Sequence, residues 1–255
     1  MNDTNTKKRP LGTRWCSIGS TLTGIGLVLV GIGLLGARLN VTSPVNTFLI
    51  FGLGMFAILV SVPTLVIGLA ISGGHAGAVS PARARSALLV GVAMIIAGGM
   101  NFANREPVPP IHDLTTDVNN PPEFVALVKI RAADKAQNPP EYSGEETATL
   151  QQEAFPDLVT LRLDADPATV FEAAGEVIRE LGWDIAAEVQ ATGRLEATDT
   201  TTWFRFRDDV VVRIQPSNGG TTVDVRSKSR VGRGDMGTNA ARIREFLARL
   251  QTKLS

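Results

Sequence analysis

Three windows of the sequence contain no ionisable side chain, and they constrain the fold more than any other feature. They cover residues 17–37, 48–72 and 86–104. An α-helix rises about 1.5 Å per residue, so about 20 apolar residues cross a hydrocarbon core of about 30 Å. We therefore predict three transmembrane helices over these ranges, after a short N-terminal segment of residues 1–16. The end of the first window lacks a good cleavage site, which favours a retained anchor over a signal peptide.

Basic residues flank the three windows unevenly, and short cytoplasmic loops are usually the more basic ones. Those on one side of the predicted bundle are Lys7, Lys8, Arg9, Arg14, Arg83 and Arg85. The loop between the first two windows holds only Arg38. We therefore predict a cytoplasmic N-terminus and a C-terminal domain outside the cytoplasm. The glycine-rich helices and the lack of an organelle-type transit sequence indicate a bacterial inner membrane, with the domain in the periplasm and the lipid bilayer as a partner.

Glycines recur at helical spacing inside the first window. Gly19, Gly26 and Gly33 are seven residues apart, and so are Gly24 and Gly31. Small residues let helix backbones approach closely in lipid, where packing drives association. We expect these helices to pack with one another or with a partner. Because an intramembrane charge is costly and usually functional, the charge-free windows argue against ion or proton transport.

The rest of the chain has a different composition. Residues 1–103 hold seven basic side chains and one acidic one, whereas residues 104–255 hold eighteen basic and twenty-four acidic ones. Prolines interrupt residues 105–157, which we interpret as a proline-rich linker or arm. Within it, Glu123–Ile130 resembles a short strand. Residues 158–255 are predicted to form an α+β soluble domain, an antiparallel sheet with helices packed on one face.

Local signals place several elements of this domain. Ser143 followed by Glu146 predicts a capped helix in the arm. Asp166 before Pro167 predicts the start of an amphipathic helix. Asn218-Gly219-Gly220 predicts a hairpin turn between two strands, and the chain ends in a second amphipathic helix. We interpret Asp208-Asp209 as a further turn.

The residue types exclude the common catalytic templates for the soluble domain. The only histidines are His75, in a loop between predicted helices, and His112, in the arm, while the only cysteine is Cys16. A Ser-His-Asp triad, a Cys-His pair and an ordinary zinc site therefore have no residues in the domain. We predict no catalytic residue, no metal and no cofactor. Enzymatic activity stays open, although we lean against it.

Charge placement in the last quarter of the chain marks a candidate binding surface. Residues 104–199 hold seven basic and nineteen acidic side chains, whereas residues 200–255 hold eleven basic and five acidic ones. Alternate residues of a strand face opposite sides of a sheet, so the cations near the C-terminus are expected on the side opposite the apolar residues. A glycine-punctuated loop then leads into the last helix, where free backbone N–H groups can hold an anion. The candidate residues are Arg205, Arg207, Arg213, Arg226, Lys228, Arg230, Arg233 and Asp235.

Two interpretations of these residues stay open. They can pair with the acidic part of the domain and solvate the sheet, which we favour. They can also form a site for an anionic ligand, a lipid headgroup or an envelope protein partner. Nucleic acid is not expected as a partner, because the domain is predicted to lie outside the cytoplasm and is acidic overall.

Two segments of the domain resemble a known family. Residues 203–214 read WFRFRDDVVVRI, and residues 224–237 read DVRSKSRVGRGDMG, continuing through Asn239 and Arg242-Ile243. Both are similar to signatures of the domain of unknown function 1499 family, over most of residues 111–252. Some members of that family carry N-terminal membrane spans. The resemblance implies an uncharacterised bacterial envelope protein, and it implies no activity, cofactor or functional residue.

The leading functional hypothesis is a non-enzymatic, membrane-anchored binding or assembly module with an external domain. One alternative is an envelope enzyme that acts on lipid or cell-wall material through Asp208, Asp235 and arginine side chains. The other alternative is a purely structural membrane subunit.

Overall fold

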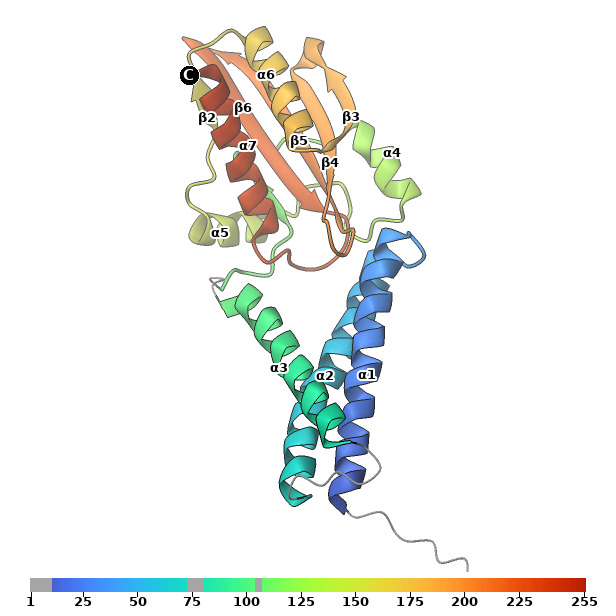
Figure 1. The fold of residues 1–255 in the computed structure, drawn as a ribbon. Coiled ribbons are helices and arrows are strands. Elements are labelled where there is room, and N and C mark those ends of the chain that lie inside the picture. Colours follow the sequence, from blue (N-terminus) through green and yellow to red (C-terminus); the bar gives the residue numbers. More distant parts are fainter. Residues whose placement is uncertain (1–10, 73–79, 104–106) are drawn as a thin grey trace, which may run out of the picture. The chain divides into compact units, whose positions relative to one another are not determined.

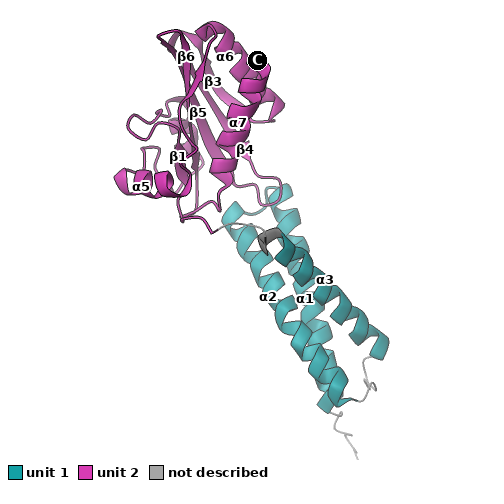
Figure 2. Cartoon of the chain, turned by 90° about the vertical axis from the view of Figure 1, so that its left-hand side faces the viewer, with its two compact units in different colours: residues 1–106 teal, residues 107–255 magenta. Residues whose placement is uncertain are grey.

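The structure, a computed structural model, describes residues 11–72, 80–103 and 107–255. The predicted flanking residues Lys7, Lys8 and Arg9, and also His75, lie outside these ranges. In chain order (Figure 1) the elements are α1 (Leu11–Arg38), α2 (Pro44–Ile71), α3 (Pro81–Ala103), β1 (Asp113–Thr115), α4 (Ala126–Ala133), α5 (Glu145–Ala154), β2 (Leu161–Leu163), α6 (Pro167–Glu180), β3 (Asp184–Val189), the 3-10 turn η1 (Gln190–Thr192), β4 (Arg194–Thr200), β5 (Arg207–Ser217), β6 (Gly220–Ser229) and α7 (Thr238–Leu254). They divide into two compact units, residues 1–106 and 107–255 (Figure 2).

The first unit consists of three long helices, as predicted. Each of α1, α2 and α3 is long and apolar enough to cross a membrane. Each helix also begins before its charge-free window. In α2 the reason is local: Ser43 caps the helix by accepting a hydrogen bond from the N–H of Asn46 at 3.3 Å, and Pro44 occupies the first turn. Hydropathy therefore locates the spans, whereas capping residues decide where the helices start.

Glycines bring α1 and α2 into close contact. A Cβ atom added at Gly26 would lie 2.5 Å from Ile58 Cγ1 and 2.7 Å from the carbonyl oxygen of Gly54, and one at Gly19 would lie 2.5 Å from Leu65 Cγ. Only glycine fits these positions without moving the helices apart. By contrast, a Cβ at Gly24 would meet nothing within 4 Å. The two glycine series in the sequence thus face different surroundings.

We expect Gly26→Leu to destabilise the helix pair by about 2 kcal/mol, because overfilling a packed interface forces backbones apart. Thermal unfolding of the full chain in detergent measures the effect. Gly24→Leu is the matched control, since it makes the same change on the same helix where space is open, and it should leave the midpoint unchanged. Equal losses for the two variants would contradict the packing assigned to Gly26.

The second unit is built on an open antiparallel sheet, which confirms the predicted α+β class. Its strand order is β1-β6-β5-β4-β3, and β2 also pairs with β6. The long β5–β6 hairpin forms the centre, and it turns at Asn218-Gly219, where Gly219 has a φ of 89°. That left-handed conformation suits glycine and explains the predicted turn.

The apolar face of the sheet packs against α6 and α7. Asp166 caps α6 by accepting a hydrogen bond from the N–H of Ala168 at 2.9 Å, as the sequence predicted. Trp183 stacks on Phe246 of α7, with ring centroids 5.8 Å apart. The buried core joins alternate residues of the sheet, including Leu195, Val210, Val212, Ile214, Val223 and Val225, to the inner faces of both helices.

The expected linker belongs to the domain. The second unit begins at Pro107, so residues 107–157 are part of it rather than an arm before residue 158. Strand β1 pairs with one half of β6 and β2 with the other half, along the same edge. Ile111 and Leu114 join the core. A strand of three residues is too short to show an alternating pattern in the sequence, and the prolines around it indicated irregular structure. Sequence analysis therefore did not predict the pairing of β1 with β6.

Helix α4 covers the opposite face of the sheet, where we had expected a short strand at Glu123–Ile130. The buried carboxylate of Glu196 accepts hydrogen bonds of 3.0 Å from the N–H groups of Val125, Ala126 and Leu127. It supplies the N-terminal cap that the local sequence lacks. Leu127 packs against Val211 of β5. The prediction was wrong because the residue that starts this helix comes from β4.

Two further predicted features are wrong for similar reasons. Asp208 and Asp209 lie inside β5 and are buried, so they do not form a turn; the chain turns earlier, at residues 201–206. Helix α5 begins at Glu145 and is not capped by Ser143. Instead, the hydroxyl of Ser143 donates a hydrogen bond of 3.0 Å to Asp113 Oδ2.

Candidate functional site

The candidate cations on β6 have the predicted facing but not the predicted exposure. Val223 and Val225 lie in the core, and Arg226, Lys228 and Arg230 point to the other side of the sheet. That side is covered by residues 116–143, including α4. As a result Arg226 and Lys228 are each only 1% exposed, and Arg230 is 4% exposed.

Asp113 neutralises the first two of these cations. Arg226 binds it in a bidentate manner, with Nε 2.8 Å from Oδ1 and Nη2 3.0 Å from Oδ2, and Lys228 Nζ lies 3.0 Å from Oδ2. The remaining donors reach backbone carbonyls of the covering segment: Arg226 donates to Pro122 and Pro140, and Lys228 donates to Glu141. Buried charges need such pairing, because burying an unpaired charge destabilises the fold by roughly several kcal/mol.

The pKa values reflect this competition between burial and pairing. Burial alone would raise the pKa of Asp113, but the hydrogen bonds and charges of Arg226 and Lys228 outweigh it and hold the pKa below its usual value. Burial lowers the pKa of Lys228, and Arg226 and Arg131 add to the effect, while Asp113 opposes it. The carboxylate is therefore the group that allows both cations to stay charged inside the domain.

Aromatic rings complete the surroundings of Arg226. Its guanidinium carbon lies 4.8 Å from the ring centroid of Phe124 and 5.4 Å from that of Tyr142. Burial raises the pKa of Tyr142 to about 12, with the charge of Asp113 adding to the effect and Arg226 opposing it. Both rings belong to the covering segment, so Arg226 ties that segment to β6.

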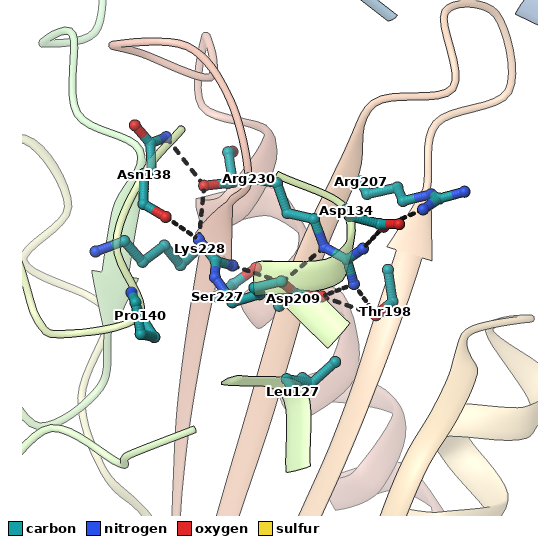
Figure 3. Close-up of polar contacts among 12 residues, drawn as sticks. Leu127, Asp134, Asn138, Pro140, Thr198, Arg207, Asp209, Ser227, Lys228 and Arg230 are labelled. Atoms are coloured by element: carbon teal, nitrogen blue, oxygen red, sulfur yellow. Dashed lines mark hydrogen bonds and ion pairs between the residues drawn. The ribbon is translucent and has the colours of Figure 1, made fainter. Parts of the chain in front are cut away.

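Asp209 is the centre of a second cluster (Figure 3). Arg230 donates to both of its oxygens, at 2.9 and 2.7 Å, and Arg131 of α4 donates to Oδ2 at 2.5 Å. Asp134 then accepts hydrogen bonds from Arg230 and from Arg207. Burial lowers the pKa of Arg230, but Asp209 and Asp134 outweigh it and raise that pKa above its usual value. This cluster joins α4 to the ends of β5 and β6.

Arg213 lies in a third group on the same side. Its Nη2 is 2.8 Å from Asp224 and 2.9 Å from Asp117. Asp224 also accepts hydrogen bonds from the hydroxyls of Thr116, at 3.1 Å, and Thr160, at 2.6 Å. Arg213 thus pairs with the acidic part of the domain, as the structural interpretation of these residues predicted.

The last three candidates occupy loops. Arg205 lies in the turn between β4 and β5 with a φ of 59°, so it does not continue a strand as expected. Arg233 is exposed in the loop before α7. Asp235 accepts hydrogen bonds from the N–H groups of Gly237, at 2.9 Å, and Asn239, at 2.6 Å. Burial raises the pKa of Asp235, opposed by these two amides and aided by Asp208.

The structure therefore separates the eight candidates into two sets. Five of them, at 207, 213, 226, 228 and 230, join the ion-pair network, and Asp235 holds the start of α7. Of the seven candidate cations, only Arg205 and Arg233 make no ion pair among the residues that the structure describes.

Sequence analysis missed the partners of the network. Those residues are Asp113, Arg131, Asp134, Tyr142 and Glu196. The available signal was the excess of acidic side chains over residues 104–199, which predicts pairing with the basic last quarter but names no individual pair. Within the described ranges, no three His, Cys, Asp or Glu side chains are placed to hold a metal ion.

We expect Asp113→Asn to cost about 3–5 kcal/mol in the free energy of unfolding, because it leaves two buried cations without a counter-charge. The pKa of Asp113 is depressed in the folded chain, so its contribution is present at neutral pH and lost as the pH falls below about 4. The variant should therefore also lose part of the acid dependence. Urea unfolding of the full chain in detergent, followed by circular dichroism across pH, measures both effects.

The control for this variant is Asp157→Asn. Asp157 also accepts two hydrogen bonds from one arginine, Arg244, but the side chains are 52% and 46% exposed. Exposed ion pairs contribute about 1 kcal/mol or less. A similar loss in both variants would show that Asp113 is not the buried counter-ion described above.

Tyr142 offers a spectroscopic test of the covering segment, because it is the only tyrosine in the chain. Its tyrosinate absorbance should titrate with a midpoint at a pH of about 12 in the folded chain, compared with about 10 in the unfolded chain. A raised folded-state pKa also means that stability is lost as the pH rises between these two values. A midpoint near 10 under native conditions would place Tyr142 in water, with residues 116–143 off the sheet.

Comparison with known proteins adds the family. A family model described as a protein of unknown function (DUF1499) matches residues 113–250. The match begins at Asp113, so it includes both the network and the segment that covers it. None of the curated proteins compared with the chain matches it.

Proposed function

Because the chain belongs to the DUF1499 family, whose description assigns no activity, we propose its function from its residues and contacts. It is a non-enzymatic, membrane-anchored binding module of the bacterial inner membrane. Its N-terminus lies in the cytoplasm and its domain lies in the periplasm. Supporting this orientation are Arg14 near the start of α1 and Arg83 and Arg85 near the start of α3, against Arg38 alone at the end of α1.

The surface proposed for recognition is formed by two loops, residues 201–206 between β4 and β5 and residues 231–237 between β6 and α7. We call these two loops the loop end. They are neighbours because the antiparallel pair Asp208–Ser229 puts the start of β5 beside the end of β6. Figure 1 shows both loops at the same end of the domain.

The observation that carries this proposal is the contrast between the loop end and the covered face of β6. Trp203 is 63% exposed, and Arg205 and Arg233 make no ion pair in the described part of the chain. A cation beside an exposed tryptophan is typical of a recognition surface. The cations of β6, by contrast, are already paired and out of reach of a ligand.

Contacts inside the fold argue against the two alternative functions, an envelope enzyme and a purely structural subunit. The carboxylates suggested for an envelope enzyme are engaged inside the fold, Asp208 with Arg242 at 2.7 Å and Asp235 with backbone amides. Of the glycines that could serve a purely structural subunit, Gly19, Gly26 and Gly33 face α2 of the same chain, so that side of α1 is not offered to a partner. Both points favour a module that acts through its soluble domain.

Labelling at the loop end tests orientation and recognition together. Thr202→Cys, in a Cys16→Ser background, places a single thiol beside Trp203. A membrane-impermeant maleimide carrying a photocrosslinker should label this thiol in intact spheroplasts, and illumination should yield a specific adduct. Arg205→Glu with Arg233→Glu should reduce the adduct at least tenfold, because it reverses the two cations of the loop end that make no ion pair in the described part of the chain.

The matched control is Arg162→Glu, which reverses an exposed arginine on β2. Arg162 pairs in register with Thr222, at the opposite end of β6. This variant should leave the adduct unchanged. Labelling only after permeabilisation would contradict the orientation, and an adduct that survives the double reversal would contradict the assigned surface.

A further inference from the structure

We propose that the loop end docks on the anionic headgroup layer of the membrane that anchors the chain. This inference takes the recognition surface from the proposed function and names the partner that this surface binds. The partner is a lipid surface that carries negative charge, such as one containing phosphatidylglycerol.

The first argument is how the chain enters the domain. Residues 107–112 run along the loop end: the N–H of Asp235 donates to the carbonyl of Ile111 at 3.3 Å, and the N–H of Ser229 donates to that of His112 at 3.0 Å. A Cβ added at Gly234 would lie 2.8 Å from Pro110 Cα. The chain therefore enters the domain beside residues 231–237 of the loop end.

The covalent reach of this connection is short. Helix α3 ends at Ala103 and the second unit begins at Pro107. Four residues span at most about 14 Å in any conformation, since an extended chain covers about 3.6 Å per residue. The chain itself therefore limits how far the entry point at Pro107, beside residues 231–237, can lie from the anchor.

The second argument is the chemistry of the exposed side chains. Trp203 is 63% exposed and Met236 is 54% exposed, one on each loop. Tryptophan is enriched where membrane meets water, because its ring is apolar and its N–H donates to headgroups. Arginine adds attraction to lipid phosphates and can bind them with two parallel hydrogen bonds.

The loop backbones support this presentation. Arg205 has a φ of 59° and Met236 a φ of 53°, in the left-handed region that residues with a side chain rarely adopt. Such conformations persist only where the surrounding structure holds them. Each loop therefore holds its backbone in a fixed conformation at one of these residues.

The third argument is charge complementarity. The soluble part of the chain holds more acidic than basic side chains, so most of its surface would be repelled by anionic lipid. At the loop end, the nearby carboxylate of Asp134 is engaged by Arg207 and Arg230, and Asp235 is engaged by amides. Arg205 and Arg233 stay available. The charge distribution thus favours one approach to the membrane, with the loop end first.

The test uses the full chain in lipid nanodiscs, with a nitroxide on Thr202→Cys in the Cys16→Ser background. Discs of phosphatidylcholine alone are compared with discs that also contain phosphatidylglycerol. With phosphatidylglycerol the label should become less mobile and less accessible to a water-soluble relaxation agent, and added salt should reverse the change. Each cation near an anionic surface favours docking by about fivefold, so reversing two should weaken it by at least about 25-fold.

Three variants separate the contributions. Arg205→Glu with Arg233→Glu should abolish the response to phosphatidylglycerol, and Trp203→Ala should weaken it without changing any charge. Arg162→Glu should leave it intact, because β6 carries that position about 24 Å away from the loop end. Arg162, Trp203 and Arg233 are exposed and Arg205 is partly exposed, and an unaltered unfolding midpoint confirms the fold of each variant.

Different outcomes distinguish this inference from the proposed function. A label that behaves identically in both kinds of disc overturns lipid docking. If the double reversal then still removes a protein adduct in spheroplasts, the loop end binds a protein partner and the proposed function stands. If neither the discs nor the adduct respond to the double reversal, both proposals fall.

Discussion

The second unit depends on one constraint: β6 turns Arg226, Lys228 and Arg230 away from the apolar core, onto a face of the sheet that is buried as well. Such cations can be buried only with carboxylates and carbonyl oxygens around them, since the free energy lost on desolvating an unpaired charge exceeds the stabilisation gained from packing. Asp113 and Asp209 are the fully buried carboxylates that meet this need. Both bind two cations, and each cluster ties β6 to a segment that lies far from it in sequence.

This constraint explains why a proline-rich segment becomes part of the domain. Prolines expose carbonyl oxygens without competing N–H donors, and the carbonyls of Pro122 and Pro140 accept hydrogen bonds from Arg226. The segment therefore serves as a polar lining for the cations, while Phe124 and Leu127 provide the apolar contacts. Helix α4 is held by polar groups from the sheet at both ends, by Glu196 at its start and by Asp209 through Arg131 near its finish.

The network also determines which cations of the domain lack a partner charge. Once the β6 cations are paired, the basic side chains of the last quarter that make no ion pair in the described part of the chain are Arg205 and Arg233. Both lie in its loops, and Arg205 is two residues from Trp203. The same loops flank the residues through which the chain enters the domain. The proposed recognition surface and the entry of the chain into the domain thus lie at the same end of the domain.

Local patterns in the sequence determined the three apolar helices, α6 with its Asp166 cap, α7, and the β5–β6 hairpin. Hydropathy, capping and turn chemistry act over a few residues, so they can be read without knowing the fold. The alternation along β6 likewise assigned its cations to the side away from the core. Only the tertiary structure decided that this side is buried. Asp113 lies 113 positions before Arg226, and Glu196 starts a helix whose first residue, Ala126, lies 70 positions before it. Ion pairs and caps formed over such separations leave no local pattern, because any carboxylate of suitable reach could have supplied them.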